Sequence, residues 1–254
     1  MLLFRLFMPF ILIATIISIV GGIFVMSGGL SNPKDDPAAL CKDGLQLALR
    51  TEYLPALRDF DKAIVIDRNY ARAYVGRAQV LTVLADFIGA ADNCNQAIAL
   101  DPKFAAAYAN RCVAFYWMGE YQKSLDDALT CQKLSDPAAK PAVLLTLGLA
   151  QLGMKDYAQA LKNCNESMAL LPNSPNAYSV RARIELAQKQ YEPAIADCNK
   201  SLSVASRQAH VYDTRAAAYE GLGKTQLADA DRKQSQAILD QDAAIVAEYK
   251  RTPR

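Results

Sequence analysis

Residues 71–104 read ARAYVGRAQVLTVLADFIGAADNCNQAIALDPKF, and the residues that follow begin the same pattern again with AAAYANRCVAF. A step of 34 positions leads from Tyr74 to Tyr108 and from Phe87 to Tyr121. A fixed period of this length is typical of stacked supersecondary units. The repeat therefore decides the fold of most of this 254-residue chain.

Four columns of similar residues extend the period along the chain. An aromatic column contains Tyr53, Phe87, Tyr121, Tyr157 and Tyr191, separated by 34, 34, 36 and 34 positions. The other three columns hold small residues: Ala56, Ala90, Ser124, Ala160, Ala194 and Ala228; Gly44, Ala78, Cys112, Gly148, Ala182 and Ala216; and Ala63, Ala97, Cys131, Ser167, Ser201 and Ser235. Small side chains let two helices approach closely, so each unit is predicted to be two antiparallel helices joined by a short turn.

This combination resembles the tetratricopeptide repeat (TPR) family. The second repeat carries the family's pattern as Tyr74, Ala78, Phe87, Ala90, Cys94, Ala97 and Pro102. The resemblance implies an all-α TPR superhelix of about six helix-turn-helix repeats in residues 37–242. The expected units lie near residues 37–70, 71–104, 105–140, 141–174, 175–208 and 209–242, and a C-terminal helical extension is expected over residues 243–254. Thr225 and Arg232 make the sixth repeat more polar, as in an end cap.

The N-terminal segment differs from the repeats. Residues 6–26 (LFMPFILIATIISIVGGIFVM) contain no charge and would reach roughly 31 Å as a helix, enough to cross a bilayer. We therefore expect residues 1–30 to be a single transmembrane signal anchor and residues 31–36 a linker. Arg5 favours a cytoplasmic N-terminus, with the TPR domain extracytoplasmic, or periplasmic in a bacterium. The alternative is a signal peptide cleaved near Ser27, which would release a secreted or periplasmic protein.

Composition argues against several classes of function. The net charge of +2 is too small to indicate nucleic-acid binding, and no phosphate-binding or nucleophile motif is present. No two of the six cysteines have the spacing of a zinc or redox site, so they are expected to be compact core residues. Cys94–Cys112 is the pair to test for a disulfide. His210, the single histidine, is expected at the surface. The prediction is a protein that is not an enzyme, with no cofactor, metal or small-molecule substrate.

Arginine and an acid recur sixteen positions apart. The pairs are Arg111–Asp127, Arg181–Asp197 and Arg215–Asp231, whereas Arg77 faces Asn93 and the fourth repeat has Leu147 with Asn163. The arginine is expected on the first helix of a repeat and the acid on the second, with bidentate contacts within or between repeats. A basic ligand site is less favoured, because the acids accompany the arginines.

The resemblance also implies where a partner binds. In this family the first helix of each repeat lines the concave surface, and set positions on it contact the ligand. In this chain those positions, with two polar neighbours, are Arg72, Val75, Gln79 and Val83; Asn110, Val113, Tyr116 and Trp117; Leu145, Leu149 and Leu152; and Arg183. The lysines and asparagines with which some relatives hold a C-terminal carboxylate are missing.

These residues predict a mostly apolar groove that binds another protein or a peptide, because exposed apolar patches usually mark an interface. The C-terminal tail or a tight superhelix could instead cover them. The expected function is a membrane-tethered scaffold or adaptor, with a role in assembly or stability of a membrane complex. The alternative is a soluble, secreted or periplasmic binding protein.

Overall fold

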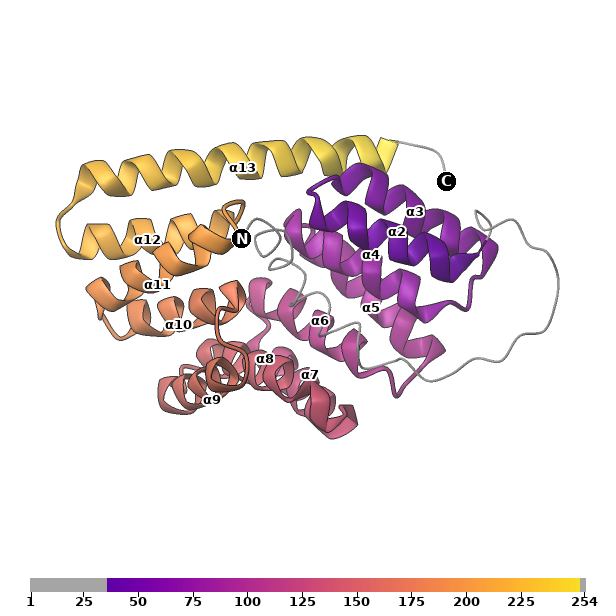
Figure 1. Cartoon of the computed structure of the whole chain (residues 1–254), viewed down its shortest axis with the longest axis horizontal. Coiled ribbons are helices and arrows are strands. Elements are labelled where there is room, and N and C mark those ends of the chain that lie inside the picture. Colours follow the sequence, from indigo (N-terminus) through magenta and orange to yellow (C-terminus); the bar gives the residue numbers. More distant parts are fainter. Residues whose placement is uncertain (1–35, 252–254) are drawn as a thin grey trace, which may run out of the picture. The chain divides into compact units, whose positions relative to one another are not determined.

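The computed structural model describes residues 36–251, and within them all regular structure is helical. Twelve α-helices form six successive pairs in this part of the chain (Figure 1), which confirms the predicted all-α helix-turn-helix repeats. The pairs are α2 (Pro37–Leu49) with α3 (Tyr53–Ile66), α4 (Ala71–Val83) with α5 (Phe87–Leu100), α6 (Ala105–Trp117) with α7 (Tyr121–Leu134), α8 (Lys140–Gly153) with α9 (Tyr157–Leu170), α10 (Pro175–Ala187) with α11 (Tyr191–Val204), and α12 (Ala209–Gly221) with α13 (Thr225–Arg251). A short 3₁₀ turn, Pro137–Ala139, precedes α8.

The small columns lie where the paired helices touch. All members of the three columns are buried in the structure. Successive pairs also approach closely, because a Cβ added at Gly76 of α4 would lie 2.4 Å from the ring of Phe60 on α3. Phe60 itself is fully buried, so the glycine makes room for a large ring in the first two repeats.

The turn inside every repeat has the same backbone geometry. One residue per turn has positive φ, between 58° and 79°: Thr51, Ala85, Gly119, Lys155, Lys189 and Gly223. The next residue donates its N–H to the carbonyl five positions earlier, as Glu52 does to Leu47 at 2.9 Å. This is the Schellman arrangement that satisfies the free carbonyls at a helix end. Four of the six positions carry a side chain in a conformation that glycine adopts at lower cost.

The described chain divides into two compact units, each with its own core. One contains residues 36–135 together with residues 243–251, and we call it the N-unit. The other contains residues 136–242, and we call it the C-unit. The N-unit core is centred on Leu57 and Phe60, and the C-unit core includes Ala182, Cys198 and Val211. Helix α13 belongs to both units, because the division falls within it, after Asp242.

Helix α13 keeps one buried face along its length. In the C-unit the residues with little exposure recur every three or four positions, at Ala228, Asp231, Ser235, Ile238 and Asp242, and Tyr249 follows in the N-unit seven positions later. This spacing places them on a single side of a helix. The helical extension expected after the sixth repeat is therefore the uninterrupted end of α13.

Two further sequence-based expectations concern the N-terminal apolar segment and the cysteines. The predicted membrane helix at residues 6–26 lies outside the described residues. Within residues 36–251, no helix combines the length and the apolar character needed to span a membrane. All six cysteines are buried free thiols, so the disulfide considered for Cys94 and Cys112 is not formed.

Candidate functional site

The candidate partner-binding residues of the second repeat lie on α4 but differ in exposure. Arg72 is exposed, Gln79 is half-buried, and Val83 is 49% exposed at the end of the helix. Val75 is 4% exposed and packs with Ala97 and Ala107, so it belongs to the core of the N-unit. The expectation of an accessible partner contact fails for Val75, because the following repeat covers its side chain.

Helix α6 carries the second group and ends in an aromatic cluster. Trp117 stacks on Phe87, with ring centroids 5.8 Å apart and planes 11° from parallel. The ring of Tyr116 is nearly perpendicular to that of Trp117, with centroids 5.5 Å apart, and its centroid lies 5.7 Å from that of Tyr121. We call Phe87, Tyr116, Trp117 and Tyr121 the aromatic cluster. Tyr121 is exposed, Trp117 is half-buried and Tyr116 is buried, so the cluster has a packed base and an accessible rim.

Only Tyr116 and Trp117 of this cluster are among the residues predicted to bind a partner. Phe87 and Tyr121 belong to the aromatic column of the repeat pattern, and each is the first residue of the second helix in its repeat. That position brings their rings against the end of α6. Two other candidates on α6 add little to the cluster: Val113 is half-buried, and the amide of Asn110 donates to the carbonyl of Ala106 at 2.8 Å.

The remaining candidates lie in the C-unit. On α8, Leu145 is half-buried, whereas Leu149 and Leu152 are buried. Arg183 is half-buried on α10. The twelve candidates therefore lie on α4 and α6 of the N-unit and on α8 and α10 of the C-unit. The apolar candidates on α8 are mostly inaccessible.

The predicted arginine–acid contacts are present and repeat along the chain. Nε and Nη2 of Arg111 donate to the two carboxylate oxygens of Asp127 at 2.8 and 2.7 Å. Arg181 binds Asp197 and Arg215 binds Asp231 in the same bidentate way. The carboxylates are buried, so these are charge-assisted hydrogen bonds inside the repeat.

Each arginine also reaches the preceding repeat, so its contacts lie both within and between repeats. Its Nη1 donates to a residue sixteen positions earlier: Asp61 for Arg77, Asn95 for Arg111, Asn165 for Arg181 and Asn199 for Arg215. A tyrosine three positions before the arginine lies under the guanidinium at 5.5 to 5.9 Å in all four cases. The donors and the flat face of these arginines are thus engaged inside the fold, which argues against a basic ligand site.

The buried thiols are unreactive at neutral pH. Burial raises the pKa of Cys94, Cys112, Cys164 and Cys198 to about 12 in each case. At neutral pH such thiols are protonated, and the thiolate is the form that reacts or binds metal. Within residues 36–251, no group of three histidine, cysteine or acidic residues could hold a metal ion.

His210 is not the surface residue that the sequence predicted. Its Nε2 lies 3.0 Å from the hydroxyl of Ser179, and burial, assisted by the positive charge of Arg183, lowers the pKa of His210 to about 3. The ring is therefore neutral at physiological pH. The serine lies in the preceding repeat, 31 residues away, so no local pattern could have indicated the contact.

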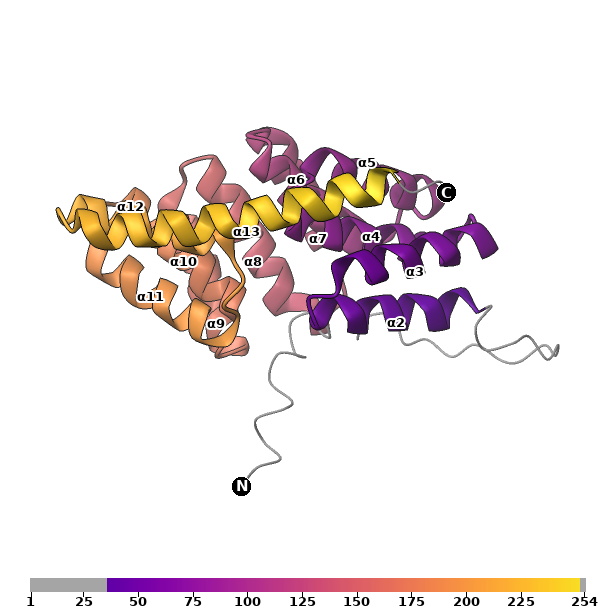
Figure 2. The same cartoon turned by 90° about the horizontal axis from the view of Figure 1, so that it is seen from above.

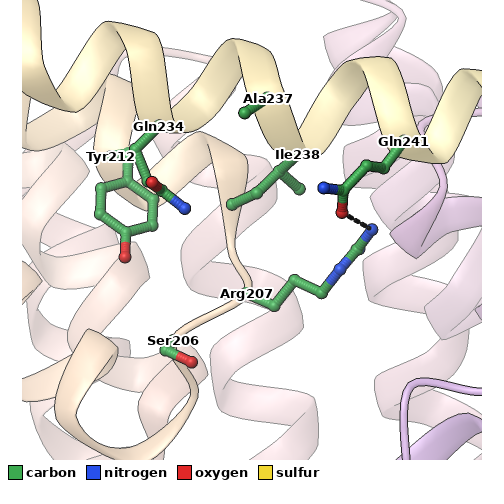
Figure 3. A pocket seen from close by; sticks show the side chains of 7 residues that line it. All are labelled: Ser206, Arg207, Tyr212, Gln234, Ala237, Ile238 and Gln241. Carbon is green, nitrogen blue, oxygen red and sulfur yellow. Dashed lines mark hydrogen bonds between the residues drawn. The ribbon is translucent and has the colours of Figure 1, made fainter.

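A small pocket opens in the C-unit between α13 and the segment that precedes α12. Figure 3 shows the side chains that line it: Ser206, Arg207, Tyr212, Gln234, Ala237, Ile238 and Gln241. Its volume is about 230 Å³. Arg207 pairs with Asp242 at 2.7 Å and lies 3.5 Å from the amide oxygen of Gln241. Because its charge is already compensated, the arginine does not mark an anion site.

Comparison with known proteins supports the fold. No protein-family model matches the sequence, and none of the curated proteins does. Among solved structures, a chain of the APC/C hetero-tetramer Cut9–Hcn1 matches with a TM-score of 0.63 and 17% identity, over 85% of this chain and 43% of that one. This chain therefore spans less than half of that protein's length.

Two bacterial TPR proteins match over more of their own length. The first is a tetratricopeptide repeat protein from Parabacteroides merdae, with a TM-score of 0.59 and 16% identity over 84% of both chains. The second is a thermophilic TPR protein from Thermus thermophilus, with a TM-score of 0.59 and 18% identity over 73% of this chain and 98% of that one. At these identities the similarity shows the TPR fold, which is consistent with a protein-interaction scaffold.

Proposed function

We propose that this protein is a membrane-tethered TPR scaffold that binds another protein or a peptide through the aromatic cluster of the N-unit. The observation that carries the proposal is the cluster itself. Phe87 and Tyr116 pack against Trp117, and Tyr116 in turn packs against the rim ring, Tyr121, which is exposed. Rigid aromatic side chains with little entropy to lose are enriched at the energetic centres of protein interfaces.

The surroundings of the cluster specify the chemistry of the partner. The arginine–acid contacts that repeat along the described residues, which we call the ladder, leave no uncompensated charge for a charged partner. A partner that presents an apolar or aromatic side chain therefore fits this surface better than a charged tail does. A binding role is favoured over catalysis, since the thiols are protonated and His210 is neutral and bonded to Ser179.

The tether is proposed from the sequence. Residues 6–26 are apolar and long enough to cross a bilayer, and Arg5 favours a cytoplasmic N-terminus with the repeats on the opposite side. Anchoring would raise the local concentration of a partner in the same membrane and strengthen a modest contact. Mass spectrometry of the mature N-terminus tests the tether: an intact residue 1–30 segment supports it, and a new N-terminus near Ser27 favours the released protein.

Photo-cross-linking tests the binding surface. A benzoyl-phenylalanine at position 117 of the full chain is expected to capture one specific protein in membranes. The same group at Val65, which is 73% exposed on α3, is the matched control and should not. Equal capture from both positions would contradict the proposal.

The captured partner then allows a quantitative test. Trp117→Ala should weaken its binding to the purified full chain at least tenfold, and Trp117→Phe should keep most of it, because a ring still stacks on Phe87. Circular dichroism and thermal unfolding show whether each variant is folded. Leu149→Ala is not a suitable probe of binding, because Leu149 is buried and its truncation would lower stability.

A further inference from the structure

The end of α13 occupies a second surface of the N-unit, distinct from the aromatic cluster. Residues 245–250 follow the exposed Ala243 and Ala244, and they pack against the first two repeats. Tyr249 is 3% exposed and belongs to the same core cluster as Leu57, Leu81 and Leu84. Ile245 and Val246 pack at the edge of that cluster, one turn earlier on the same side of the helix. Figure 1 shows this end of α13 along α3, and Figure 2 gives the view turned by 90°.

Polar contacts fix the register of this segment. The hydroxyl of Tyr249 donates to Oδ1 of Asp61 at 2.9 Å, across 188 residues of sequence. Nζ of Lys250 lies 2.7 Å from Oδ2 of Asp86, the residue that caps the start of α5. Glu248 lies 3.5 Å from Arg58, and both of these side chains are exposed. The carboxylates of Asp61 and Asp86 thus bind a tyrosine and the basic residue that follows it.

One of those carboxylates is a departure from the repeat pattern. The ladder position that Asp61 occupies holds asparagine in three other repeats, Asn95, Asn165 and Asn199, and each of these accepts from one arginine. Asp61 accepts from Arg77 and also from Tyr249 through the same oxygen. A carboxylate can take this second donor with a charge-assisted hydrogen bond. The substitution therefore serves the contact with α13 as well as the ladder.

The contact is small compared with a helix that is integral to the core. One ring is fully buried, two aliphatic side chains are half-buried, and two ion pairs have a mostly solvated lysine or arginine. Exposed ion pairs contribute little. A segment held in this way can leave its surface at a lower cost than global unfolding requires.

We propose that the surface formed by Arg58, Asp61, Asp86 and the neighbouring apolar residues, which we call the tail site, is a helix-binding site occupied by the chain's own C-terminal helix. Its external ligand is a helix of a partner protein with two adjacent aliphatic residues and, three residues after the second, a tyrosine followed by lysine or arginine. That helix binds only when residues 245–250 are displaced. The proposal goes beyond the function proposed above and does not depend on it, because the two surfaces share no residue.

A peptide experiment tests the tail site directly. The probe is a fluorescein-labelled peptide with the sequence of residues 238–254, and the readout is fluorescence anisotropy with the purified full chain. The wild-type chain should bind it poorly, because the tethered tail competes at an effective concentration on the order of millimolar. The Tyr249→Ala chain should bind it at least tenfold more tightly. A peptide that carries the Tyr249→Ala change should bind neither chain.

Two further variants keep the test decisive. Lys250→Glu reverses an exposed charge without removing core volume, so it should also increase peptide binding if Tyr249→Ala fails to fold. Asp61→Asn, made in the Tyr249→Ala chain, should lower peptide affinity while leaving an acceptor for Arg77, as in the other repeats.

Three results would overturn the proposal. The first is a folded Tyr249→Ala or Lys250→Glu chain that does not bind the peptide. The second is equal binding of the tyrosine and alanine peptides. The third is a wild-type chain that is a dimer by light scattering and becomes monomeric with Tyr249→Ala, which would identify a second copy of this chain as the occupant.

Discussion

Repeats four and five each consist of a pair of helices, but the side chains that hold the two helices together differ at three corresponding positions. Repeat four has Leu147, Gln151 and Asn163, whereas repeat five has Arg181, Glu185 and Asp197. In repeat four the amide of Asn163 donates to Gln151 at 2.7 Å, and Leu147 is buried. In repeat five Arg181 forms a bidentate contact with Asp197, and its Nε lies 3.8 Å from Glu185.

The difference shows that the hairpin does not need the ion pair in order to form. An apolar side chain with a neutral amide pair occupies the same place as an arginine with two acids. The charged version has a cost, because one arginine faces two carboxylates and Oε2 of Glu185 has no hydrogen-bond partner. Burial, together with the charge of Asp197, raises the pKa of Glu185 to about 7. Repeat five is therefore the place where the ladder can be tested by converting it into repeat four.

The largest effect is expected when the arginine alone is removed. Arg181→Leu leaves Asp197 buried without its partner, and this should lower the free energy of unfolding by about 3 kcal/mol. The matched control is the triple variant Arg181→Leu, Glu185→Gln, Asp197→Asn, which reproduces repeat four and should recover most of the loss. Urea unfolding followed by circular dichroism measures both. A triple variant no more stable than the single one would show that the two repeats are not interchangeable.

A second prediction separates the ladder from His210, another titratable group of the C-unit. The folded-state pKa of His210, about 3, lies below its ordinary value of 6.5, so His210 contributes stability above pH 6.5 that is lost as the pH falls. Between pH 7.5 and pH 5 the loss should be about 2 kcal/mol. His210→Gln cannot gain a proton, and its unfolding free energy should fall less over this range. Parallel pH profiles for the two chains would contradict the assignment.

Glu185 should show the opposite dependence on pH. Its folded-state pKa of about 7 lies above the ordinary value of 4.5, so the folded protein keeps a proton that the unfolded chain releases, and stability is lost as the pH rises from 4.5 to 7. Glu185→Gln, which copies Gln151 of repeat four, should therefore be more stable than the wild type at pH 8. The expected gain is about 1.5 kcal/mol, after allowance for partial solvation of the carboxyl group.

The control for this prediction is the pH itself. At pH 4.5 the glutamate is neutral in the folded protein, so the advantage of the glutamine should disappear. A gain that is the same at pH 4.5 and pH 8 would indicate a packing effect instead of titration.

The smallest change in stability is expected at the turn between the two helices. It should be the same in both repeats, because their turns have the same backbone conformation. Lys155 and Lys189 occupy the positive-φ position of the turn in repeats four and five, with φ of 63° and 60°. Glycine relieves the strain there, less the entropy that it adds to the unfolded chain, so Lys155→Gly and Lys189→Gly should each stabilise by about 0.5 kcal/mol. Gly119→Ala, with φ of 79°, should destabilise. Thermal unfolding of the three variants is sufficient to compare them.

Much of the site lay beyond what residue patterns could indicate. The family rule for ligand positions included Val75, but the next repeat buries it. The rule also omitted Phe87 and Tyr121, because their role in the repeat pattern concealed their contact with the end of α6. The turn geometry was not predicted either, since only two of the six positive-φ positions hold the glycine that would signal it.

The sequence by itself determined the helices, their pairing and the bidentate arginine contacts. These depend on residues that recur at a fixed spacing, and a helix pair brings residues sixteen positions apart together in every repeat where the chemistry allows it. Only the tertiary structure decided which apolar residues stay accessible, why His210 is neutral, and where the end of α13 lies. Those outcomes depend on contacts such as Tyr249 with Asp61, which join segments distant in the chain and leave no periodic trace in the sequence.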